Sequence, residues 1–139
     1  MYYKLDPEVA GHLGRDTAMD PSSHPPVVYS LHYEFDGWPA DDLVTSFPCF
    51  LVTRQMQKVL EGARPSGCSF ADLKASTSEE FEELHPGRPR PSLSRVKVSG
   101  VAGRDDFGTT PSGGSLIVSD RILKLMKQGR LDNCDITPV

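Results

Sequence analysis

One short segment concentrates acidic and aromatic side chains, the residue types of a catalytic carboxylate pair or of a protein-binding hot spot. Asp36, Asp41 and Asp42 lie around Trp38, the only tryptophan of the chain. Glycoside hydrolysis needs two carboxylates held several Å apart on either side of the scissile bond. Adjacent acids in a turn project in different directions, and the segment has no set of sugar-stacking side chains. Catalysis is therefore not expected here.

Two interpretations of this segment remain open. In the first, the turn is exposed to solvent and Trp38 packs as a lid on the hydrophobic core. In the second, Trp38 is a rigid aromatic anchor ringed by acids, which is the composition of a binding hot spot. The same mixture of acidic and aromatic residues recurs near residue 106. The candidate partner-binding residues are therefore Asp36, Trp38, Asp41, Asp42, Asp105, Asp106 and Phe107.

Other residues that often carry chemistry lack the spacing that their chemistry requires. The four histidines form no HxH or HExxH pattern, so no zinc site is expected. Gly113-Gly114 precedes an expected strand instead of following one into a helix, which argues against a phosphate-cradling loop. Ser119 lacks the Gly-x-Ser-x-Gly context of a nucleophile and is better explained as a helix N-cap. We expect no catalytic residue, no metal and no cofactor.

The cysteines and the apolar pattern bear on the cellular compartment. Cys49, Cys68 and Cys134 are an odd number without a CxxC spacing. Free buried thiols in a reducing cytoplasm explain them best, and a single disulfide is the alternative. No signal peptide is visible, and no apolar run approaches the ~20 residues of a membrane span. We expect a cytoplasmic protein without a membrane partner.

Charge is distributed unevenly along the 139 residues. Residues 1–48 contain two basic and eight acidic side chains, a net charge of −6, whereas residues 49–139 contain 13 basic and 11 acidic ones, a net charge of +2. No basic cluster is interleaved with aromatics, so nucleic acid is not expected as a partner. The acidic first third suits a basic protein partner through electrostatic steering, and a solvated acidic face is the alternative.

Short strands must position these residues. Alternation of apolar and polar side chains predicts strands at 27–35 and 68–74, and short apolar runs predict strands at 50–52 and 116–118. Further strands are expected at 2–5, 93–98 and 134–139. The Gly, Asp, Ser and Pro content of 11–26 predicts a long loop, and the turn formers of 105–114 predict a second one.

Three helices are expected between the strands. One follows the cap Thr53 and has apolar residues at i, i+3, i+4 and i+7. Thr77 opens a capping box, and the short helix after it is expected to be buried through Phe81 and Leu84. Ser119 caps the third helix.

Two of the predicted units match when the chain is shifted by 66 residues, which places Thr53 on Ser119. Each copy reads as strand, hydroxyl cap, helix, tight turn and strand, over about 50–73 and 116–139. A helix with one apolar stripe must bury it against a sheet. We predict a single α+β domain, 1–139, with mixed sheets, two similar strand–helix–strand units and a short third helix. The repeat is either a duplication or a structural similarity alone.

The chain ends in a strand, a serine-started helix and a strand with a Pro-Val end, from Leu116 to Val139. This ending resembles that of certain bacterial polymorphic-toxin immunity proteins. The resemblance implies a stoichiometric inhibitor that binds a cognate toxin in the bacterial cytoplasm and blocks its active site. On that hypothesis the acidic turn occupies a cationic cleft of the toxin, and Trp38 fixes the complex.

The alternative is a small enzyme or ligand-binding domain, with polar groups converging on a pocket between the two units; a scaffold domain is a third possibility. The inhibitor hypothesis predicts that Trp38→Ala combined with Asp41→Lys abolishes partner binding and leaves the thermal midpoint nearly unchanged. A large loss of thermal stability from Trp38→Ala would instead favour the lid interpretation.

Overall fold

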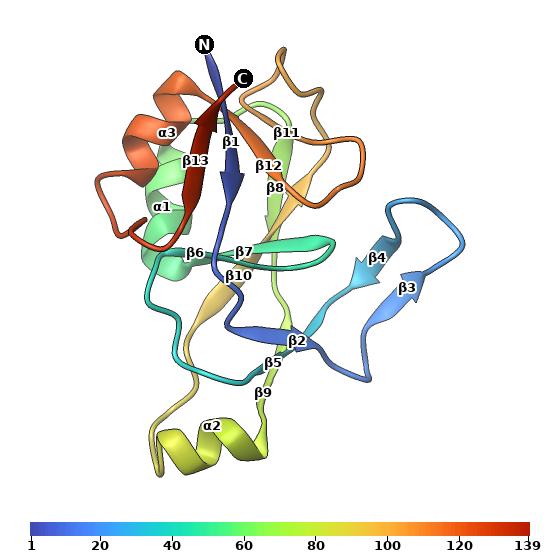
Figure 1. The fold of residues 1–139 in the computed structure, drawn as a ribbon, viewed down its shortest axis with the longest axis vertical. Helices are drawn as coiled ribbons and strands as arrows, with labels where there is room; N and C mark the ends of the chain where they lie inside the picture. The colour runs from blue at the N-terminus through green and yellow to red at the C-terminus, as the bar shows by residue number, and fades with distance from the viewer.

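The computed structural model describes all residues from 1 to 139, which form thirteen strands and three helices (Figure 1). The predicted α+β class with mixed sheets is confirmed. The helices are α1 (Arg54–Gly62), α2 (Glu79–Leu84) and α3 (Asp120–Met126). The strands are β1 (Tyr2–Asp6), β2 (Gly11–Leu13), β3 (Ala18–Asp20), β4 (Val27–Ser30), β5 (His32–Phe35), β6 (Leu43–Ser46), β7 (Cys49–Thr53), β8 (Cys68–Ala71), β9 (Lys74–Thr77), β10 (Leu93–Val98), β11 (Phe107–Thr109), β12 (Leu116–Ser119) and β13 (Asp135–Pro138).

Two four-stranded antiparallel sheets are built on the same plan. The β1 sheet has the order β11-β12-β1-β13, and the β10 sheet has the order β6-β7-β10-β8. In each sheet a strand pair leads into a helix, and the strand after the helix lies two places away. The strand between them, β1 or β10, comes from outside the strand–helix–strand segment. A distant part of the chain therefore completes each predicted unit.

The pairing register agrees with the 66-residue shift found in the sequence. In the β10 sheet Val96 lies opposite Phe50, and in the β1 sheet Leu5 lies opposite Leu116, which is 66 residues after Phe50. The pairs on the other side of each middle strand agree in the same way. The structural similarity of the two units thus extends to individual pairs of residues, and duplication stays one of the two explanations of it.

Both long helices bury their apolar faces in one core. Met56 and Leu60 of α1 and Ile122 and Met126 of α3 are all at most 4% exposed. Burial of each such side chain contributes about 1.5–3 kcal/mol relative to its exposure to water. The two helices lie side by side along the sheets in Figure 1. The first core consists of Leu5, Leu43, Phe50, Val52, Met56, Leu60, Val96, Phe107, Leu116, Val118, Ile122, Leu123, Met126 and Leu131.

A second group of elements lies outside the two repeated units. β2, β5 and β9 form a three-stranded sheet with β5 and β9 parallel, β3 and β4 form a hairpin, and α2 follows β9. We call the segments that carry them, 7–42 and 72–92, the accessory lobe; it occupies the lower part and right side of Figure 1. A second core joins it to the β10 sheet through Ala10, Val28, Leu31, Tyr33, Phe35, Val44, Cys49, Leu51, Phe81 and Leu93.

The β10 sheet contributes to both cores because successive side chains of a strand point to opposite faces. Leu43, Phe50 and Val52 belong to the first core, whereas Val44 and Leu51 belong to the second. The accessory lobe and the two helices therefore cover opposite faces of the same sheet.

Several expected strand and loop boundaries are wrong. The loop predicted at 11–26 contains β2 and β3, and the loop predicted at 105–114 contains β11. The strand predicted at 27–35 is divided into β4 and β5, and Tyr29, on its expected buried face, is 65% exposed. The strand predicted at 68–74 is β8 and the start of β9, which belong to different sheets. Each of these differences depends on a pairing partner that is distant in the sequence.

The helix starts agree only in part with prediction. Thr53 caps α1, since the N–H of Met56 donates to its hydroxyl at 3.2 Å. The cap of α2 is Ser78 instead of Thr77. Phe81 is buried as predicted, but Leu84 is 61% exposed because the six residues of α2 bury only one position.

Candidate functional site

Asp41 and Asp42 bind the turn that follows α3. The carboxylate of Asp41 is buried and accepts hydrogen bonds from the backbone N–H and the side-chain amide of Asn133, at 2.7 and 3.2 Å. Asp42 accepts from the Thr53 hydroxyl at 2.9 Å and from the N–H of Arg130 at 2.7 Å. Asp41 is only 3% exposed, so the expectation that it belongs to an accessible binding surface is wrong.

Asp106 occupies the equivalent place in the second unit. It accepts hydrogen bonds from the Ser119 hydroxyl at 2.7 Å and from the N–H of Ser66 at 3.0 Å, and it forms an ion pair with Arg121 at 2.5 Å. Desolvation acts to raise the pKa of this carboxyl. The hydrogen bonds from Arg121, Ser119 and Ser66 outweigh desolvation and hold the pKa of Asp106 at about 2.

We call these two arrangements the aspartate clamps. Each aspartate precedes the first strand of its unit and binds the hydroxyl at the start of its own helix, Thr53 for Asp42 and Ser119 for Asp106. Each also binds an N–H in the turn after the other unit's helix. The backbone carbonyls of the two aspartates accept the N–H of the same helix-start residues, at 3.0 Å in both units. The clamps therefore join the two units reciprocally.

Asp105 and Phe107 also support the framework. Asp105 accepts the N–H of Val101 at 2.7 Å within its own turn. Phe107 is fully buried in the first core, which corrects its assignment to a binding surface. The acid-rich segments repeat because Asp41-Asp42 and Asp105-Asp106 are equivalent framework positions, a correspondence at a shift of 64 residues that the 66-residue match did not include.

Asp36 and Trp38 lie in the accessory lobe with partly exposed side chains. The Trp38 ring packs beside the buried ring of Phe81, with 6.2 Å between the centroids. The guanidinium carbon of Arg88 lies 3.4 Å from the centroid of the same indole, a cation–π contact. This packing is what the lid interpretation predicts, yet part of the indole stays accessible.

A shallow pocket of about 300 Å³ lies beside Trp38 and combines apolar and acidic groups. Val9 and Leu84, which also line it, are 68% and 61% exposed, far more than apolar residues in a core. Asp36 and Glu80 add carboxylates to the rim. We call Val9, Asp36, Trp38, Glu80 and Leu84 the Trp38 face.

Charge is distributed unevenly between the accessory lobe and the rest of the chain. The accessory lobe holds twelve acidic and four basic side chains, a net charge of −8, or −6 without Asp41 and Asp42, which are engaged with the turn after α3. The rest of the chain holds seven acidic and eleven basic ones, a net charge of +4. All four glutamates of α2 are exposed, and one of them, Glu80, belongs to the Trp38 face. The molecule is therefore markedly more acidic on the accessory lobe than elsewhere.

A line of polar side chains crosses the β2-β5-β9 sheet. His12, Glu34 and Ser76 are opposite one another in register. Glu34 lies 3.1 Å from His12 Nε2 and accepts the Ser76 hydroxyl at 3.1 Å. His12 Nδ1 also lies 2.9 Å from Asp36, and the pKa of His12 is raised, chiefly by this contact. The sequence does not reveal this line of side chains. Alternation within a strand depends on neighbouring residues, whereas the pairing of β5 with β9 joins residues that are distant in the sequence.

The buried ring of His32 continues this line but does not activate Ser76. Its Nε2 lies 2.7 Å from the Ser76 hydroxyl, as in a serine hydrolase. Its Nδ1 accepts the backbone N–H of Asp16 at 3.2 Å, so the ring proton is on Nε2. Nε2 therefore donates to Ser76 and is not available as a base. The arrangement stabilises the sheet.

The cysteines show no activated thiol. All three cysteines are free, and burial raises the pKa of Cys68 to about 11 and of Cys134 to about 12, which keeps both thiols protonated.

A pocket of about 510 Å³ lies between α1 and α3. It is lined by the polar side chains of Gln55, Gln128 and Arg130 and by the apolar Met56, Val59 and Leu125, while the carboxylate of Asp42 on its wall is already engaged.

No group of three or more His, Cys, Asp or Glu side chains is arranged to hold a metal ion. None of the three helices has the length and apolar character needed to cross a membrane. No family model matches the chain, and no curated protein or solved structure shows significant similarity to it.

The aspartate clamps predict a specific pH dependence of stability. Asp106→Asn removes charge-assisted hydrogen bonds and should lower the free energy of unfolding at pH 7 by about 1.5–3 kcal/mol. The folded pKa of about 2 lies below the ordinary value of 3.8, so this stabilisation is complete above pH 4 and is lost as the pH falls through 2. Urea denaturation between pH 2 and 7 measures it.

Asp135→Asn is the matched control because Asp135 is an exposed acid. It removes the same charge and should change stability by less than about 0.5 kcal/mol at every pH. Equal effects of the two substitutions would contradict the clamp.

Proposed function

We propose that the protein is an immunity-type inhibitor that binds a cognate bacterial toxin in the cytoplasm and blocks it. The observation that carries this function is the Trp38 face, where exposed apolar side chains surround a partly exposed indole and carboxylates form the rim. Apolar anchors inside a polar rim are the arrangement of a protein-binding hot spot.

Charge favours a basic partner. The net charge of −6 that the accessory lobe has without Asp41 and Asp42 accelerates encounter with a cationic surface, and the substrate clefts of toxins that act on polyanions have that character. The rest of the chain, with its net charge of +4, is disfavoured as a contact for the same partner.

The anchor is held in place before binding. Trp38 is restrained between Phe81 and the Arg88 guanidinium, so little side-chain entropy remains to be lost when a partner covers it. Of the residues expected from the sequence, Asp36 and Trp38 carry the contact. Val9, Glu80 and Leu84 join them, and the clamp aspartates support the fold.

A paired substitution on the face tests this function. Glu80→Lys with Leu84→Ser reverses a rim charge and removes an apolar contact at two exposed positions. The partner is the C-terminal domain of a secreted toxin encoded beside this gene, produced in a bacterial host. Co-expression of the unchanged protein should restore growth, and the paired variant should lose this protection with a nearly unchanged thermal midpoint.

Glu61→Lys with Val101→Ser is the matched control, with the same change of charge and of polarity at exposed positions outside the lobe. It should protect fully. Asp41→Lys is unsuitable as a binding test because Asp41 is buried, and it should unfold the turn after α3. The inhibitor function is wrong if the neighbouring gene encodes no growth-arresting domain, or if the face variant protects as well as the control.

A further inference from the structure

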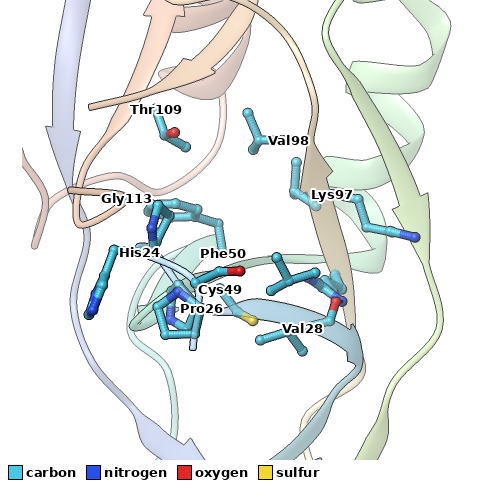
Figure 2. Close-up of a pocket in the computed structure, with 15 residues that line it drawn as sticks. His24, Pro26, Val28, Cys49, Phe50, Lys97, Val98, Thr109 and Gly113 are labelled. Carbon is cyan, nitrogen blue, oxygen red and sulfur yellow. The ribbon is translucent and has the colours of Figure 1, made fainter. Parts of the chain in front are cut away.

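A second pocket, of about 500 Å³, lies where the accessory lobe meets the framework (Figure 2). In the figure His24 and Gly113 stand on one side and Val28 on the other, with Cys49 and Phe50 between them. Pro26, Val27 and Pro48 add an apolar wall with accessible side chains. The volume is within the range of sites for small organic ligands.

No carboxylate lines this pocket, although the chain as a whole is acidic. Its charged lining groups are Arg95 and Lys97, both from β10, and His24 is the other basic side chain. The side chain of Lys97 is exposed and extends away from Gly113 and Phe50 in Figure 2. Arg95 is thus the cation that belongs to the pocket.

The guanidinium of Arg95 lacks a counter-charge. Its Nη1 donates to the carbonyl of Val28 at 2.9 Å, while its Nε is buried without any hydrogen-bond partner. Arg95 takes part in none of the ion pairs of the molecule. A buried N–H group without a hydrogen-bond partner is unfavourable, so the chain keeps Arg95 here at a cost in stability.

The equivalent position in the other unit shows what the accessory lobe changes. Lys4 stands in β1 where Arg95 stands in β10, one residue before Leu5 and Val96 respectively. The side chain of Lys4 is 41% exposed and lies 4.0 Å from Asp6. Arg95, in contrast, is covered by the backbone of β4, and its charge faces no acid.

We propose that this pocket binds a small amphipathic anion, with a carboxylate or phosphate paired to Arg95 and a hydrocarbon body against Pro26, Val27 and Pro48. A guanidinium recognises either anion through paired hydrogen bonds, and the apolar wall selects ligands that carry a chain or ring. Such a site is separate from the Trp38 face and does not depend on toxin binding.

Calorimetric titration with octanoate, octylamine and inorganic phosphate tests the site. Octanoate should bind saturably, octylamine of the same length should not, and phosphate should bind more weakly because it lacks the hydrocarbon body. Arg95→Met should weaken octanoate at least about tenfold, the loss expected for a charge-assisted hydrogen bond. Lys97→Met, the neighbouring cation on the same strand face, should leave affinity within about twofold.

The site is refuted if octanoate does not saturate, if octylamine or phosphate binds as tightly as octanoate, or if Arg95→Met and Lys97→Met have equal effects. Arg95→Lys keeps the charge without the planar fork and should bind octanoate with intermediate affinity. If Arg95→Met does not fold, the comparison of octanoate with octylamine on the unchanged protein decides by itself.

Discussion

Hydrogen bonds to the carboxylates of two aspartates determine how the molecule is assembled. Asp42 and Asp106 each hold the first strand of a unit, the hydroxyl that starts its helix and the turn that follows the other unit's helix. Charged acceptors with several donors are strong and directional, and removal of one partner leaves the others unsatisfied. The helices α1 and α3 are thereby fixed beside each other, and the first core closes between them and both sheets.

This constraint separates framework from function. Acids that form clamps are not available to a partner, so the recognition surface that we propose comes from segments that the repeat does not explain. Those segments form the accessory lobe, which carries the excess negative charge, the Trp38 face and the cover over Arg95. A protein built in this way keeps its folding determinants in the repeated part, so that the accessory lobe can vary without disturbing them.

Local patterns revealed the repeated units but not their completion. The cap at Thr53, the buried Phe81 and the match of the two units follow from side-chain periodicity, which depends on neighbours in the sequence. The insertion of β1 and β10 into the sheets depends on long-range pairing, as does the parallel contact of β5 with β9. The sequence places Asp41 and Phe107 at a binding surface because their distant contacts are not visible in it. Acidic and aromatic residues in a turn have the same sequence pattern whether their side chains face solvent or contact a distant part of the chain.

Native-state hydrogen exchange tests the reciprocal framework most directly. Amides of β1 and β10, together with the N–H groups of Thr53 and Ser119 that donate to the clamp aspartates, should form one slowest-exchanging set at near-global unfolding free energy. The β3–β4 hairpin and α2 should exchange faster. If β1 instead exchanges with these peripheral elements while β10 stays protected, the two units are not joined as described.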